Sequence, residues 1–178
     1  MTACHKEAKI KTYTGQIFDL WNPIPEQVSI PDIAHALSNI CRFGGHTRVH
    51  YSVAQHSVLV SSQLNSKDAL VGLLHDAAEA YVGDMVKPLK NALPEFSEVE
   101  ARIWQAICSR FGIDPVLPLS VKTADLRMLR TEQRDLFPSI APGLFSEGEA
   151  PYPAIVSPWP RSTAETIFLE NFHLWYEA

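Results

Sequence analysis

Hydrophobic and polar residues alternate along most of the chain with the spacing of amphipathic α-helices. In the first such stretch, which follows start signals at residues 29–32, Ile33, Leu37 and Ile40 fall on one side of a helix. The same spacing predicts further helices over residues 51–60, 68–82, 96–111, 121–136 and 162–177. The chain shows no internal repeat and no alternation of strands with helices, so the pattern predicts a mostly α-helical fold.

Capping residues mark several of the expected helix ends. Ser52 and Ser162 stand where two helices begin and are expected to be N-caps, while Gly112 follows the end of another helix. Leu126 is expected among the inward-facing residues of the helix over 121–136.

The remaining segments predict one small hairpin and several loops. Residues 11–20 are rich in β-forming types around Gly15 and predict a short hairpin, and residues 87–90 predict a loop. Prolines and glycines are dense over 137–160, which predicts a long loop covering the surface. We therefore expect an all-α single domain over residues 1–178 with a short N-terminal β-hairpin, a core at about 30–136, a Pro-rich loop at 137–160 and a C-terminal helix at 162–177.

The composition is that of an ordinary globular protein with an acidic surface. Of the 178 residues, 46% are hydrophobic and 20% are charged, and the net charge is −5 with a pI near 5.8. Because duplex nucleic acid is bound through basic patches, we expect no nucleic-acid partner. Cys4, Cys41 and Cys108 form no CxxC pair, and no apolar run has the length of a signal core or a membrane span. These features predict a cytoplasmic protein in a reducing compartment, with no membrane partner.

The stretch 73–84 places ionisable residues among helix-forming apolar ones. On a helix, His75 lies four residues from Glu79 and Asp76 lies three from it, so the three side chains share one side. His75 and Asp76 point about 100° apart, and one cation between them could contact both. Imidazole nitrogen and carboxylate oxygen are good ligands for borderline divalent metals. The alternative is a solvated histidine next to a pair of surface carboxylates.

Two more ionisable residues fall on neighbouring helical patterns. Taken alone, His56 could be a core histidine bonded to a backbone carbonyl, and Asp125 could be a carboxylate on a helix surface. Together with the His75-Asp76 pair they provide two imidazoles and two carboxylates. That set is softer than a typical magnesium site and harder than a thiolate zinc site.

The order His56, His75-Asp76, Asp125 resembles the H…HD…D signature of the HD-domain metal-dependent phosphohydrolases. The likeness extends to the run 51–57 (YSVAQHS) and to the run 75–84 (HDAAEAYVGD). Both are similar to the branch that contains bacterial 5′-deoxynucleotidases and phage dATP triphosphohydrolases, and the likeness covers roughly residues 30–136. Phe43 stands where that branch usually has a tryptophan after its arginine, which puts the expected base or sugar stacking in doubt.

The resemblance implies roles for individual residues. The metal ligands would be His56, His75, Asp76 and Asp125. Glu79 would act as the general acid or base, and Asp84 would orient water or the sugar. The substrate contacts would come from Arg42, Phe43, His46, Lys87 and Lys90. For Lys87 and Lys90 a solvated surface lysine is the alternative, and for His46 the alternative is a cap on the turn at Gly44-Gly45.

The resemblance also implies the cofactor and the type of substrate. It implies one catalytic divalent transition metal (Zn, Co or Mn), and it allows additional Mg²⁺ bound with the phosphates. The expected substrate is a deoxynucleotide in a bacterial or phage-infected cytoplasm, and the expected assembly is a homo-oligomer, either a dimer or a hexamer. We expect hydrolysis of dATP to deoxyadenosine and triphosphate. The alternatives are a 5′-deoxynucleotidase that acts on monophosphates and an HD module that binds nucleotides without turnover.

Overall fold

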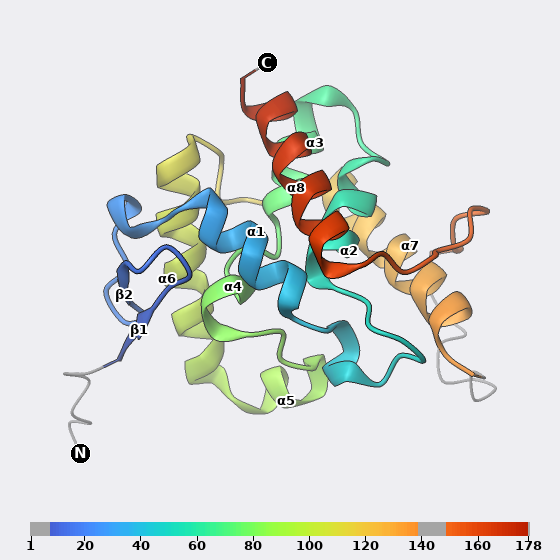
Figure 1. Ribbon diagram of the computed structural model, residues 1–178, viewed down its shortest axis with the longest axis horizontal. Coiled ribbons are helices and arrows are strands. Elements are labelled where there is room, and N and C mark those ends of the chain that lie inside the picture. The colour runs from blue at the N-terminus through green and yellow to red at the C-terminus, as the bar shows by residue number, and fades with distance from the viewer. Residues whose placement is uncertain (1–7, 139–148, 178) are drawn as a thin grey trace.

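A computed structural model describes residues 8–138 and 149–177 as a bundle of α-helices with a small β-hairpin at one side (Figure 1). The strands are β1 (Lys9–Lys11) and β2 (Ile17–Asp19), and single 3₁₀ turns lie at η1 (Pro25–Gln27) and η2 (Arg42–Gly45). The α-helices are α1 (Ile30–Asn39), α2 (Val53–Ser61), α3 (Ser66–Leu74), α4 (Glu79–Val82), α5 (Lys87–Ala92), α6 (Pro94–Phe111), α7 (Leu119–Leu136) and α8 (Arg161–Tyr176). The predicted mostly helical fold with an N-terminal hairpin is thus confirmed.

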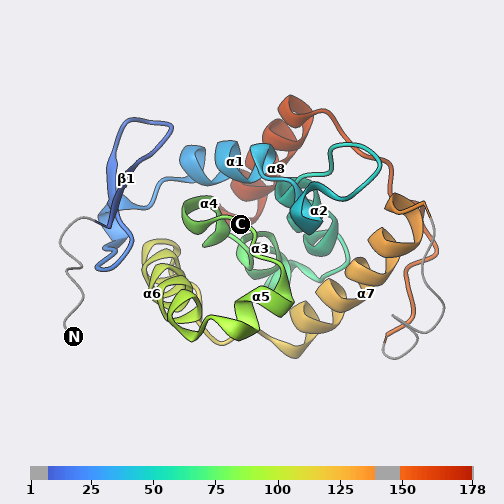
Figure 2. The same cartoon turned by 90° about the horizontal axis from the view of Figure 1, so that it is seen from below.

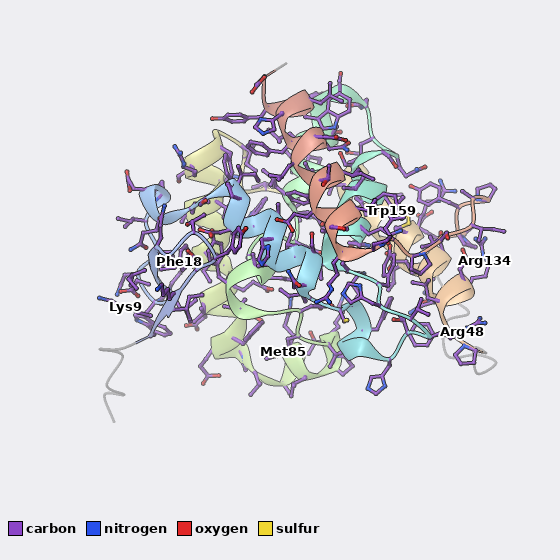
Figure 3. The ribbon with its side chains drawn as sticks, in the orientation of Figure 1. Lys9, Phe18, Arg48, Met85, Arg134 and Trp159 are labelled. Carbon is purple, nitrogen blue, oxygen red and sulfur yellow. The ribbon has the colours of Figure 1, made fainter. Side chains whose placement is uncertain are left out.

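The hairpin is antiparallel and is fixed to α1. Ile10 pairs with Phe18, whose side chain is fully buried. Asp32, in the first turn of α1, accepts hydrogen bonds from the backbone N (2.6 Å) and the Oγ1 (2.9 Å) of Thr14 in the hairpin turn. Phe18, labelled in Figure 3, joins the hydrophobic core from the hairpin.

The main core lies where α8 crosses α1, α2 and α3, as the two views of the ribbon show (Figures 1 and 2). Its members are aliphatic and aromatic side chains that the helical spacing turns inward. Among them are Ile33, Leu37, Val53, Ala54, Val58, Leu73, Leu74, Ile103, Ile107, Phe168 and Phe172.

A second, smaller apolar cluster lies between α2 and α7. Tyr51, Val60, Met128 and Leu136 belong to it. The Pro-rich segment that precedes α8 is held against α2 by Gln55. Its side chain donates to Ser157 O at 2.8 Å and accepts from the backbone N of Trp159 at 2.8 Å. Residues 137–138 and 149–160 form no helix or strand, as predicted, and the middle of the predicted loop lies outside the described residues.

The predicted continuous helix over 68–82 is wrong. The chain forms α3 up to Leu74, then a tighter turn over 75–78, then the short α4. In this turn Ala77 N bonds Leu74 O (2.8 Å) and Glu79 N bonds Asp76 O (3.0 Å), which is the i→i+3 pattern of a 3₁₀ helix. The break falls at the His-Asp pair itself.

Three further predictions need correction. Residues 87–90 belong to α5 instead of a loop, because Pro88 sits in the first turn of the helix, where its missing N–H is not needed. Ser162 is inside α8 and does not cap it, since the helix begins at Arg161 directly after Pro160. Leu126 is 36% exposed, because α7 turns Met128 toward α2 in its place. Within the described residues, no helix combines the length and apolarity that crossing a membrane requires.

Candidate metal centre

Helix α2 carries His56 into the interior of the molecule. Ser52 caps this helix by accepting a hydrogen bond from Gln55 N at 3.1 Å, as the sequence predicted. The helix is buried on nearly all sides, and the His56 side chain is completely buried. An imidazole in such a place requires polar partners on both of its nitrogens.

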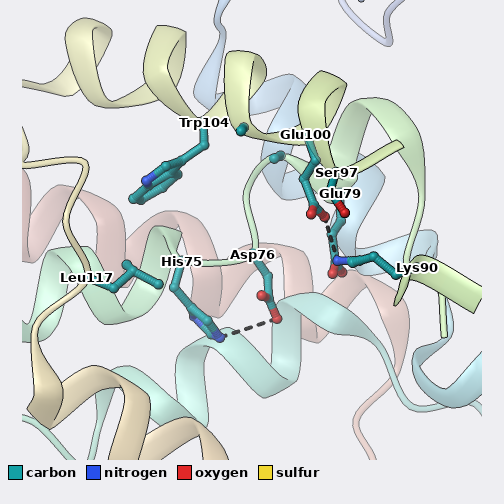
Figure 4. Close-up of a pocket in the computed structure, with 10 residues that line it drawn as sticks. His75, Asp76, Glu79, Lys90, Ser97, Glu100, Trp104 and Leu117 are labelled. Atoms are coloured by element: carbon teal, nitrogen blue, oxygen red, sulfur yellow. Dashed lines mark hydrogen bonds and ion pairs between the residues drawn. The ribbon is translucent and has the colours of Figure 1, made fainter. Parts of the chain in front are cut away.

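His75 and Asp76 reach the same point from the tight turn between α3 and α4. Figure 4 shows both side chains pointing to one side of this turn, with His75 Nε2 3.3 Å from Asp76 Oδ2. Asp125 on α7 completes the group.

The distances fit ligands of a single ion. His56 Nε2 lies 3.3 Å from His75 Nε2, 3.2 Å from Asp125 Oδ1 and 3.5 Å from Asp76 Oδ2, and His75 Nε2 lies 3.9 Å from Asp125 Oδ1. Two ligands bound at about 2.1 Å and about 90–110° apart are separated by about 3.0–3.4 Å. One atom each from His56, His75 and Asp125 forms a set in which every pair lies within 4.8 Å. Asp76 is close to both imidazoles but lies outside that tightest set.

Both histidines are oriented so that Nε2 faces the centre. His56 Nδ1 lies 2.6 Å from Glu132 Oε1, and His75 Nδ1 lies 2.8 Å from the backbone oxygen of Gly72. Each of these acceptors requires the proton on Nδ1, which leaves the lone pair on Nε2. Two imidazole lone pairs and two carboxylates then converge on one point, so positive charge has to lie between them. The donor set fits a divalent transition metal.

Glu132 is a component that the sequence analysis missed. This carboxylate is fully buried, accepts from Tyr51 Oη at 2.7 Å as well as from His56, and pairs with Arg42 Nε at 3.2 Å. A signal was available, because Glu132 follows Asp125 by seven residues and thus lies two turns along the same face of α7. Burial of a carboxylate is costly unless it is paired, and here three donors surround it.

The charge balance of the cluster appears in the pKa values of its members. Burial by itself disfavours the His56 imidazolium, but Glu132 and Asp125 outweigh burial and raise the pKa of His56 to about 9. Burial likewise disfavours charge on His75, while Asp76 and Asp125 raise its pKa. Burial would raise the pKa of Asp125, yet hydrogen bonds from the two histidines hold it far below its ordinary value. Without a cation, protons therefore supply the positive charge that the carboxylates demand.

The two predicted catalytic carboxyls lie beside this cluster. Glu79 is buried, and its Oε2 has no hydrogen-bond partner among the described residues. Burial, with Asp76 and Asp84 nearby, raises the pKa of Glu79 to about 10. Burial and the charge of Asp76 also raise the pKa of Asp84 above its ordinary value. Glu79 is therefore able to hold a proton near neutral pH.

Arg42 and Phe43 occupy η2 next to the cluster. Arg42 is buried, and besides Glu132 it reaches Asp76 Oδ2 with Nη1 at 3.5 Å. Phe43 has a φ of 57°, a strained conformation for a bulky residue, and its ring meets the Arg42 guanidinium at 5.2 Å and the Phe137 ring at 5.2 Å. Arg42 thus joins two carboxylates of the site.

The other expected substrate contacts are less central. His46 is exposed, and its backbone N closes the glycine turn by bonding Phe43 O at 3.2 Å. Lys87 is exposed at the start of α5. Lys90 Nζ forms a 2.7 Å ion pair with Glu100 on α6, at the rim of a cavity that His75, Asp76 and Glu79 also line (Figure 4).

Comparison with known proteins provides relatives for the chain. No known protein-family profile matches it. It is 46% identical to the uncharacterized protein YfdR of Escherichia coli (strain K12) over 127 residues, which cover 71% of each chain. It is 36% identical to the uncharacterized protein RCAP_rcc00048 of Rhodobacter capsulatus over 159 residues, which cover 82% of this chain and 78% of the relative. At this identity and coverage, the chain belongs to the family of YfdR and RCAP_rcc00048.

Proposed function

We propose that this protein is a metal-dependent phosphohydrolase that removes phosphate from a deoxynucleotide. The observation that carries the proposal is the convergence of His56, His75, Asp76 and Asp125, with both Nε2 lone pairs turned to the centre by buried acceptors. The resemblance of these residues and their surroundings to the HD phosphohydrolases adds the reaction and the substrate class.

Several residues of the site would have defined roles in this reaction. A divalent cation, when bound, would lower the pKa of a water molecule and polarise the phosphorus centre. Glu132 and the Gly72 carbonyl would keep His56 and His75 in the tautomer that binds a cation. The Glu79 carboxyl, protonated in its buried position, would donate its proton to the 5′ oxygen as the P–O bond breaks.

The charges around the site favour a monophosphate over a triphosphate. The expectation of a triphosphate relied on positive charge from Arg42, His46, Lys87 and Lys90 for the polyphosphate tail. Arg42 is already paired with two carboxylates and Lys90 with Glu100, which leaves Lys87, exposed at the start of α5, and the exposed His46. A single phosphate needs less neutralisation than a triphosphate, and the cation itself would supply much of it. The dATP triphosphohydrolase activity is the alternative within the same site.

The test is hydrolysis of deoxynucleoside mono- and triphosphates by protein stripped with a chelator and then reloaded with Mn²⁺, Co²⁺ or Zn²⁺. We expect orthophosphate and nucleoside from the monophosphates, at a higher kcat/KM than any release of triphosphate from dATP. Release of intact triphosphate at the higher kcat/KM would favour the alternative. Stoichiometric binding of metal and nucleotide without turnover would mean a binding module.

A further inference from the structure

One face of α6 forms a groove beside the candidate metal centre. Ser97, Glu100, Ala101 and Trp104 follow one another at the spacing of a single helical face, and all four line a cavity of about 230 Å³. The facing wall comes from the turn that carries His75, Asp76 and Glu79 (Figure 4). Small side chains at 97 and 101, between larger ones, leave the space open.

The two ends of this groove differ in chemistry. At one end lie the Lys90–Glu100 ion pair and Glu79, a buried carboxyl whose Oε2 has no partner among the described residues. At the other end lie Trp104 and Leu117, as Figure 4 shows. The indole Nε1 of Trp104 donates to Pro115 O at 2.9 Å, which fixes the plane of the ring before any ligand arrives.

We propose that Trp104 and Leu117 form the nucleobase site, with the base stacked on the indole while the phosphate lies at His75 and Asp76. The inference rests on the proposed phosphohydrolase function and names the group that binds at the far end of its substrate. A fixed aromatic plane suits any flat base, because every base offers a π-face. The volume is below the range of about 300–1,000 Å³ of drug-sized pockets, so the cavity accepts a small planar group rather than a long chain.

Two observations argue against other arrangements. Among the residues that line the groove, Lys90 is the one lysine or arginine, and its charge is already paired with Glu100, so the groove offers no spare cation to a polyphosphate tail. Phe43, the aromatic residue expected to stack on the substrate, is not among the residues that line this cavity, and its ring already contacts Arg42 and Phe137. Trp104 is thus the aromatic residue that this cavity offers to a base.

The test compares two substrates that share a phosphate and a sugar, of which only one carries a base. For metal-loaded Trp104→Ala, KM for a deoxynucleoside monophosphate should rise by about 5- to 150-fold, while KM for deoxyribose 5-phosphate should change by less than about twofold. Trp21→Ala is the matched control. This tryptophan packs under the Arg102 guanidinium, 4.3 Å from its ring centroid, and does not line the cavity, so its loss should leave both KM values unchanged.

A second variant covers the case in which Trp104→Ala does not fold. Ala101 is exposed on α6 and lines the groove, so Ala101→Leu should fill the groove without disturbing the core and should raise the same KM selectively. Equal changes for both substrates, or no change for the nucleotide, would overturn the base site. If the wild-type protein hydrolyses neither substrate, the phosphohydrolase proposal itself fails, and the two failures are thereby distinguished.

Discussion

Helix α2 has two contrasting sides. On one side Val53, Ala54 and Val58 pack against residues of α3 and α8 such as Leu73 and Phe168, and we call this the apolar seam. The other side faces α7. There His56, with Tyr51 from just before the helix, meets Glu132 and Asp125, and we call this the charged seam. The apolar seam stabilises the fold by removing surface from water. The charged seam incurs a desolvation cost that its internal ion pairs offset only when every partner is present. Stability and chemistry thus lie on opposite sides of one helix.

The largest effect should follow from removing a metal ligand in the charged seam. His75→Ala removes one Nε2 that faces the centre, and we expect bound metal and hydrolysis to fall to background. Metal analysis after dialysis, together with the phosphate-release rate, measures both. Lys87→Ala, on the exposed start of α5, is the control and should keep full metal content. Full activity of His75→Ala would exclude the proposed centre.

The next effect concerns catalysis without loss of metal. Glu79→Gln keeps the shape of the side chain but cannot exchange a proton. We therefore expect kcat to fall by about 10²–10⁴-fold while metal content and the melting temperature stay near those of the wild type. If bound metal falls in parallel with activity, Glu79 is a ligand and not the general acid.

A substitution in the apolar seam should lower stability and leave metal binding unchanged. Phe168→Ala removes a fully buried ring and should lower the free energy of unfolding by about 3–5 kcal/mol. The metal Kd of the folded fraction should stay unchanged, because no ligand or its partner is touched. Urea unfolding and metal titration measure the two quantities. A large change in metal Kd would show that the two seams are coupled.

Glu132→Gln tests the orientation of His56 within the charged seam. The amide keeps the volume but removes the charge that holds His56 Nδ1–H and Arg42. Loss of such partners typically weakens metal binding by about 10–100-fold. Tyr51→Phe, which removes one donor to the same carboxylate, is the control and should change metal Kd much less. If Glu132→Gln and the wild type have equal metal Kd, Glu132 does not orient His56 for metal binding and contributes only to packing.

The smallest predicted effect is that a rise in pH lowers the stability of the metal-free protein but raises its affinity for metal. His56 has its pKa raised to about 9 from the 6.5 of a free imidazole, so its stabilising protonation is complete below pH 6.5 and is lost as pH rises through about 9. Metal-free protein should therefore lose stability between pH 7 and about 9.5, whereas metal affinity should rise because metal displaces those protons. Thermal unfolding with and without metal measures both trends. Identical trends would contradict the exchange of protons for metal.

The sequence predicts those parts of the fold that depend on local signals. The Ser52 cap on α2 and the left-handed Gly112 after α6, with a φ of 68°, are confirmed where the local chemistry required them. The break of the helix at His75 was not predicted, because the Ala-rich stretch favours a continuous helix. In the structure the His75 side chain bonds Gly72 O, an acceptor that an unbroken helix would give to the backbone N of Asp76.

Of the candidate metal centre, the sequence predicts only the four residues of the H…HD…D pattern. His56, His75, Asp76 and Asp125 come together in the structure, although the sequence gives no sign of which atoms would face inward. Glu132 sits in the polar helix α7, where a single glutamate is ordinarily a surface residue. Its spacing from Asp125 places it on the same face of α7, but only the packing of α7 on α2 makes it a buried partner of His56, and one sequence does not show that packing. The same holds for Trp104, which helical spacing alone would assign to packing.

The proposed metal centre requires that one divalent cation binds between α2, α7 and the turn after α3. Anomalous diffraction from crystals loaded with Co²⁺ or Mn²⁺ tests it directly. We expect a single strong peak at about 2.0–2.2 Å from Nε2 of His56, Nε2 of His75 and a carboxylate oxygen of Asp125. A peak elsewhere, or none at these atoms after stoichiometric loading, would contradict it.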